Sequence, residues 1–103
     1  GTALMLGEAA AKGKGKSLPE LRVAVRDGIS GSREKGTIGF ASLRGGGVVG
    51  EHEVSFTSDS ERISIKHEAF SRDIFVNGAI KAALWSKEKK PGLYDMLNVL
   101  NLR

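Results

Sequence analysis

The stretch from Val48 to Ala69, VVGEHEVSFTSDSERISIKHEA, decides the fold class of this chain. Apolar and polar residues alternate over Val48–Thr57 and again over Arg62–Ala69, with a turn at Ser58-Asp59-Ser60 between them. A period of two residues is typical of strands that have one covered and one wet face, so the stretch predicts an antiparallel hairpin. The side chains on the face predicted to be covered are Val48, His52, Val54, Phe56, Ile63, Ile65 and His67.

Two more strands are predicted upstream of this hairpin. Thr37–Leu43 is a strand that ends at Gly45-Gly46-Gly47, and Leu21–Val25 is a shorter one. Asp27-Gly28 between them has the composition of a tight turn. The predicted fold class is therefore α+β: an antiparallel or mixed sheet of about four strands with helices on one face, the other face, which is wet, being used for oligomerisation.

The predicted helices lie at the two ends of the chain. Thr2–Lys12 is rich in strong helix formers and ends at Gly13, and Thr2 is either the N-cap or a first-turn residue. Ser71 is the predicted N-cap of a second helix over Ile74–Trp85, which only Asn77 and Lys81 interrupt with polar side chains. A helix with so few polar side chains is predicted to be buried on most sides, by the sheet and by another chain.

Two shorter segments complete the predicted secondary structure. Lys14–Pro19 is expected to be a polar loop, and Leu93–Leu100 has room for one or two helical turns.

Length and composition limit the chain to one compact domain of 103 residues. There is no cysteine, so disulfides and thiolate chemistry are excluded, which fits a reducing compartment. No apolar run approaches the ~18 residues that a membrane span needs, so no membrane partner is expected. The chain starts at Gly1 without a methionine, and we expect it to be cut from a longer protein.

The net charge of +4 is concentrated in one segment, Lys12–Lys35. That segment holds seven positive residues (Lys12, Lys14, Lys16, Arg22, Arg26, Arg33 and Lys35) and three negative ones (Glu20, Asp27 and Glu34). A local basic excess attracts anions, which leaves nucleic acid, phosphate-bearing cofactors and carboxylate substrates as candidate partners. A solvated loop that keeps the protein soluble explains the same charges.

Several motifs resemble functional sites but lack the structural context that those sites need. Gly45–Gly50 matches the letters G-x-G-x-x-G, yet a strand follows instead of the helix that a dinucleotide site requires. His52 and His67 lie on the apolar faces of their strands, so they are expected to be buried structural imidazoles. Two histidines without a carboxylate on their face are too few ligands for a zinc site. No nucleophile motif is present. The residues alone therefore assign no catalytic group, no cofactor-binding residue and no metal ligand.

Six segments in order resemble one family, the C-terminal domain of dihydrodipicolinate reductases. They are GTAL at 1–4, GTIGFA at 36–41, GVVGEH at 47–52, ERISIKH at 61–67, SRDIFVNGA at 71–79 and KPGLYDM at 90–96. The similarity covers essentially the whole chain.

The resemblance implies the C-terminal domain, spanning 1–103, of a 4-hydroxy-tetrahydrodipicolinate reductase. Such enzymes use NADPH or NADH to reduce a cyclic dicarboxylate in the diaminopimelate route to lysine, and are cytoplasmic homotetramers. The resemblance places the catalytic histidine and lysine, and an N-terminal Rossmann domain, upstream of Gly1. The chain alone is then expected to be inactive and to hold no cofactor.

The resemblance also implies site residues. Gly1 and Thr2 match the family's step that binds a substrate carboxylate, and an anion is favoured at a helix N-terminus. Thr2 acting only as a helix cap explains its presence equally well. Arg72 and Phe75 are positions that approach the cofactor or a neighbouring subunit in related enzymes, and otherwise are a first-turn and a core residue.

Two alternatives of other classes stay open at this point. One is a basic nucleic-acid-binding domain, which is weakened because the aromatic residues do not interleave with the basic ones as in single-strand-binding surfaces. The other is an assembly module whose wet sheet face pairs with copies of itself.

Overall fold

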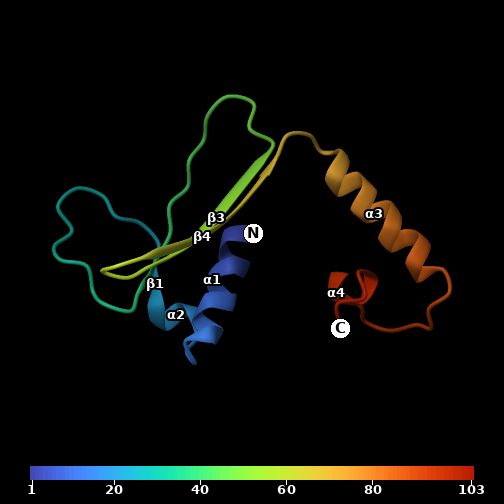
Figure 1. Ribbon diagram of the computed structural model, residues 1–103, viewed down its shortest axis with the longest axis horizontal. Coiled ribbons are helices and arrows are strands. Elements are labelled where there is room, and N and C mark those ends of the chain that lie inside the picture. Colours follow the sequence, from blue (N-terminus) through green and yellow to red (C-terminus); the bar gives the residue numbers. More distant parts are fainter. The chain divides into compact units, whose positions relative to one another are not determined.

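The computed structural model describes all 103 residues, which form two compact units, Gly1–Glu68 and Ala69–Arg103. Figure 1 shows their helices and strands. In chain order these are α1 (Thr2–Gly13), α2 (Leu18–Leu21), β1 (Arg22–Val23), β2 (Ile38–Gly39), β3 (Gly50–Thr57), β4 (Arg62–Ala69), α3 (Asp73–Ser86) and α4 (Met96–Val99). The class is α+β, as the sequence predicts.

The predicted hairpin is confirmed, with β4 at the predicted bounds and β3 two residues shorter at its start. The Ser58 N–H donates to the Glu61 carbonyl at 2.9 Å to close the turn, and the hydroxyls of Ser55 and Ser64 lie 2.6 Å apart across the strands. Ser55 therefore lies opposite Ser64. Three residues farther along each strand, the same register places His52 opposite His67. The hairpin therefore carries its apolar side chains and both histidines on one face.

The predicted sheet of about four strands is wrong. The structure has two separate two-stranded sheets, β3 with β4, and β1 with β2 in parallel, with Arg22 opposite Ile38 and Val23 opposite Gly39. β1 and β2 have only two residues each, and residues 40–49, with three consecutive glycines, belong to no strand. The ladder that would join β2 to β3 is therefore missing.

A small core holds the first unit together. Ala11, Leu18 and Leu21 are buried, and Ile38 and Phe40 pack against them. This cluster joins α1, α2 and the end of β2, so it fixes the position of α1 against Ile38 and Phe40. α1 also lies against β3, covering part of the hairpin's apolar face.

The predicted Lys14–Pro19 loop ends earlier than expected, because α2 begins at Leu18. Glu20 explains the start of this helix: its carboxylate accepts hydrogen bonds from the Ser17 hydroxyl at 2.6 Å and the Ser17 N–H at 2.7 Å. These two residues form a capping box around Pro19, a residue suited to the first turn of a helix. The Ser17 hydroxyl, and then its N–H, hold the pKa of Glu20 below its ordinary value of 4.5.

The Glu20 cap predicts a pH dependence at the start of α2. A carboxylate whose folded pKa is lowered stabilises the fold above 4.5 and loses that effect as the pH falls through the folded pKa. In an NMR pH titration, the Glu20 carboxyl midpoint should lie below 4.5 and the Ser17 amide should shift with it. Ser17→Ala should return the midpoint toward 4.5. An unchanged midpoint in that variant would contradict the capping interaction.

The second unit consists of α3, α4 and the segment between them. Trp85 on α3 packs edge-to-face on Tyr94, with ring centroids 5.1 Å apart, and the Tyr94 hydroxyl donates to the Lys90 carbonyl at 3.0 Å. α3 extends one residue beyond its predicted range at each end. The Leu93–Leu100 prediction is confirmed as the single turn of α4.

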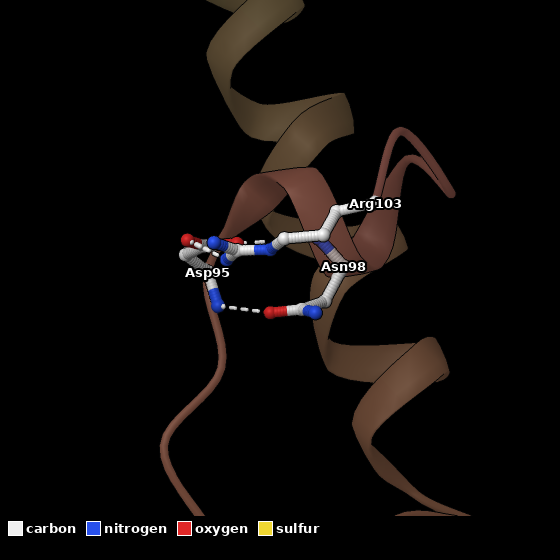
Figure 2. A network of polar contacts seen from close by, with 3 residues as sticks. All are labelled: Asp95, Asn98 and Arg103. Atoms are coloured by element: carbon white, nitrogen blue, oxygen red, sulfur yellow. Dashed lines mark hydrogen bonds and ion pairs between the residues drawn. The ribbon is translucent and has the colours of Figure 1, made fainter.

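A polar network closes the C-terminal end of this unit (Figure 2). Asp95 is the N-cap of α4: its carboxylate accepts from the Asn98 N–H at 3.2 Å, and its own N–H donates to the Asn98 side-chain oxygen at 3.0 Å. The Arg103 guanidinium pairs with the same carboxylate. The hydrogen bond from the Arg103 guanidinium, which is also an ion pair, keeps the pKa of Asp95 below its ordinary value of 3.8.

The predicted burial of Ile74–Trp85 by the sheet and by another chain stays a prediction, because the second unit by itself leaves α3 uncovered. No side chain of α3 is buried, and Ile74, Phe75, Val76 and Ile80 each keep about half of their surface exposed. The physical reason lies in its own unit, which offers little more than Tyr94 and α4 as packing partners.

None of the helices has both the length and the apolar character needed to cross a membrane.

Candidate functional site

The first turn of α1 begins at Gly1 and Thr2. Gly1 is the N-cap and its carbonyl accepts the first helical hydrogen bond, from the Met5 N–H at 3.2 Å. Thr2 is the first helical residue, and no side chain caps the helix, so the idea that Thr2 acts only as a cap is wrong. The N–H groups of Thr2, Ala3 and Leu4 thus have no intrahelical acceptor.

The electrostatics at this end favour an anion. No acidic side chain lies in the first turn of α1, while Lys12 lies in its last turn. Free N–H groups and the helix dipole give the N-terminus a partial positive charge of about +0.5. Thr2 is exposed and carries a hydroxyl beside those donors. The arrangement can bind a carboxylate through backbone N–H groups and one side-chain hydroxyl.

A close contact farther along the helix fixes the position of α1. Gly7 is buried, and a Cβ at this residue would clash with the Phe40 ring and lie 3.3 Å from Cδ1 of Leu18. Ala11, one turn on, is 1% exposed. Two small residues on one face therefore let α1 approach the Phe40 side chain closely, which orients the N-terminal turn.

The other residues considered from the sequence lie elsewhere. Arg72 is the N-cap of α3, while the Ser71 hydroxyl, predicted as the cap, accepts from the Asp73 N–H at 3.2 Å. Phe75 is 51% exposed, so its interpretation as a core residue is wrong. Both belong to the second unit, whereas Gly1 and Thr2 belong to the first.

The two histidines are less buried than expected. His52 is half-buried and His67 is exposed, because α1 lies against β3 and leaves β4 open. No three side chains of histidine, aspartate or glutamate come together as a metal-ligating group in the chain.

The glycine-rich segment does not form a dinucleotide cradle. Gly46 has a positive φ of 50° in a turn, and the next element is the strand β3, from Gly50, instead of a helix. The pyrophosphate of a nicotinamide dinucleotide needs a helix N-terminus immediately after the glycines. The residues present here therefore do not fit that cofactor.

Comparison with known proteins decides the family. Residues 1–100 match the family described as dihydrodipicolinate reductase, C-terminus. The chain belongs to this family. Its relatives include proteins named 4-hydroxy-tetrahydrodipicolinate reductase from Allorhizobium ampelinum, 60% identical, from Brucella melitensis, 59% identical, and from Cereibacter sphaeroides, 58% identical, each over 102 residues.

These dihydrodipicolinate reductase relatives are much longer than the chain. The match takes in 99% of the chain and 38% of each of the three relatives. The resemblance drawn from the six sequence segments is thus confirmed at the level of family, and the matched part is the C-terminal one.

Sequence reasoning missed one feature of the first unit. Lys14, Arg26 and Arg33, which belong to the basic segment, line a common cavity. The signal was present as the local charge excess, but charge counting gives no information on which side chains converge.

Proposed function

We propose that the chain is the substrate-binding and assembly domain of a 4-hydroxy-tetrahydrodipicolinate reductase. The whole enzyme would transfer hydride from NADPH or NADH to a cyclic dicarboxylate, forming tetrahydrodipicolinate in the diaminopimelate route to lysine. The observation that carries the proposal is the family match over residues 1–100, together with relatives of that name at up to 60% identity. A cytoplasmic location follows from the same proposal.

Within that reaction, the role of this chain is to bind one carboxylate of the substrate. The uncapped first turn of α1 supplies N–H donors and the Thr2 hydroxyl, and Gly1 supplies no side chain that would block the anion. Holding the substrate in a fixed orientation lowers the entropic part of the barrier to hydride transfer. The cofactor, which does not fit this chain, would be held by the part of the relatives that the chain does not match.

A substitution at Thr2 tests this role. Thr2→Val keeps the shape of the side chain and removes its hydroxyl, so the affinity for dipicolinate, the aromatic parent of the substrate, should fall about tenfold. Calorimetric titration measures the affinity. Ser86→Ala, which removes a hydroxyl from α3 instead, should leave it unchanged. Equal binding by wild type and Thr2→Val would contradict the assignment of Thr2.

The proposal also predicts that the chain has no turnover of its own. Hydride transfer requires both a positioned cofactor and proton transfer, and the chain's residues build neither a dinucleotide cradle nor a recognised acid–base group. With NADPH and the substrate, absorbance at 340 nm should not fall faster than in buffer. Turnover that depends on the concentration of the chain would overturn this.

The assembly part of the proposal is a homotetramer formed through the sheet. Ile63, Ile65 and Phe56 share the apolar face of the hairpin and are 59%, 63% and 48% exposed. A strand that exposes apolar side chains and an unpaired edge is an association surface. They lie on the apolar face, which α1 covers only at β3, and not on the wet face that the sequence pattern predicts to form the contact. These side chains support the tetramer, with β4 as the contact strand.

The nucleic-acid alternative makes a different prediction. A protein that neutralises several phosphates binds with a steep salt dependence. We expect no such binding to duplex or single-stranded DNA or RNA, because the basic residues are interspersed with Glu20, Asp27 and Glu34.

A further inference from the structure

The first unit contains a cavity of about 720 Å³ that the substrate-binding proposal does not use. It lies between α1, the segment around residues 26–37, β2 and the tip of the β3–β4 hairpin. Neither Gly1 nor Thr2 lines it. Its volume is within the range of about 300–1,000 Å³ that is usual for sites of small organic ligands.

The lining combines an apolar wall with a positive charge excess. Leu6, Ile38, Phe40, Val54 and Phe56 provide the apolar part. Lys14, Arg26 and Arg33 are the cations, and Glu53 and Asp59 are the anions, so the cavity carries one more positive than negative side chain. Such a site suits a ligand that has an apolar body and an anionic group.

The two arginines have unused donors. Lys14 donates to the Gly36 carbonyl at 2.9 Å, and Glu53 accepts from the Ser55 hydroxyl at 2.9 Å. Neither Arg26 nor Arg33 takes part in any hydrogen bond or ion pair in the chain. A guanidinium presents five N–H donors in a planar fork that matches a carboxylate in a bidentate manner.

Gly39 leaves room for one of these arginines at the cavity. The Arg26 guanidinium lies against Gly39 so closely that a Cβ at residue 39 would clash with Nη1 and lie 3.3 Å from Cζ and Nη2. Gly39 does not have a positive φ, so its backbone conformation does not by itself require glycine. The absence of a side chain is instead what leaves room for the guanidinium.

We propose that this cavity binds a small organic carboxylate with an apolar body, and that Arg26 receives its carboxylate. The apolar wall contacts the body of the ligand, and Arg33 and Lys14 add to the positive potential around the carboxylate. Ala3 belongs both to the cavity wall and to the first turn of α1, so the two sites adjoin. Because neither Gly1 nor Thr2 lines the cavity, its occupant is a second ligand and not the substrate carboxylate held by Thr2.

Benzoate is a suitable probe, because it joins one carboxylate to one apolar ring. Followed by amide NMR on the ¹⁵N-labelled chain, it should give saturable shifts at Gly36, Gly39 and Phe40, with little change at Thr2. Neutral benzamide should not saturate. Shifts that are linear in benzoate, or centred on Thr2, would overturn the proposal.

Three variants test the role of Arg26. Arg26→Met should weaken benzoate about tenfold or more, since it removes a charge-assisted hydrogen-bonding pair. Gly39→Ala keeps the charge but displaces the guanidinium, and should weaken benzoate as well. Arg44→Met removes an arginine outside the cavity and is the matched control. If it weakens benzoate as much as Arg26→Met does, general charge attraction explains the binding and the proposal fails.

Discussion

Replacing Gly7 by leucine should destabilise the first unit by about 2–3 kcal/mol, the upper range for forcing a side chain into a packed contact. Gly7 is buried, and even a Cβ at this position would clash with the Phe40 ring. A leucine therefore pushes α1 away from Phe40 and Leu18, two of the few side chains that form the core. The gain of ~1 kcal/mol from replacing a helical glycine is too small to offset this.

Urea unfolding measures this effect, and Gly13 provides the control. Gly13 ends the same helix, and a Cβ there would meet nothing within 4 Å. Gly13→Ala should leave stability unchanged or raise it by up to ~1 kcal/mol. If Gly7→Leu and Gly13→Ala unfold at the same urea concentration, the packing of α1 on Phe40 is not as described.

Replacing Ile65 by aspartate should convert the assembled protein to monomers. Ile65 is 63% exposed in the single chain, so its side chain contributes little to the chain's own fold. In an assembly that covers β4, however, the aspartate would be an unpaired charge in an apolar contact, which costs several kcal/mol. The association constant should therefore fall by more than a hundredfold.

Light scattering after size-exclusion chromatography distinguishes the states. The unaltered chain should have four times the mass of 11.0 kDa, and Ile65→Asp should have the single mass with an unchanged circular dichroism spectrum. Ser64→Asp adds the same charge on the opposite face of the strand and should remain assembled. A monomeric wild type at high concentration would contradict the proposed assembly.

Local patterns predicted the helices and the hairpin well because their causes are local. Period-two alternation gave β4 at its observed bounds, and a run of helix formers ended by Gly13 gave α1. The α2 helix was missed because four residues carry no periodicity, and its start depends on a single Ser17–Glu20 capping box.

The long-range features could not be predicted in the same way. Pairing of β2 with β3 depends on whether residues 40–49 leave the chain extended, and three consecutive glycines permit many conformations. Burial of Phe75 and His67 depends on what covers α3 and β4, and a pattern of apolar residues does not reveal whether its partner is in the same chain. The convergence of Arg26 and Arg33 on one cavity is likewise a tertiary property.

For the candidate site, the sequence predicted the residues and the structure defined their positions. The interpretation of Gly1 and Thr2 came from a family resemblance, which the match over residues 1–100 confirms as to family. The uncapped first turn of α1 gives that interpretation a physical basis, since its N–H groups have no other acceptor within the helix.

The most direct test of the central claim is a dipicolinate titration of the ¹⁵N-labelled chain, followed residue by residue through its amide signals. A carboxylate held at this first turn should give saturable shifts at Thr2, Ala3 and Leu4. They are separate from any shifts at Gly36, Gly39 and Phe40, where the Arg26 cavity would also receive a ring-bearing carboxylate. Thr2→Val should require about ten times more dipicolinate for the same shifts. Saturable shifts confined to other segments, or none at all, would contradict a substrate-binding role for the first turn of α1.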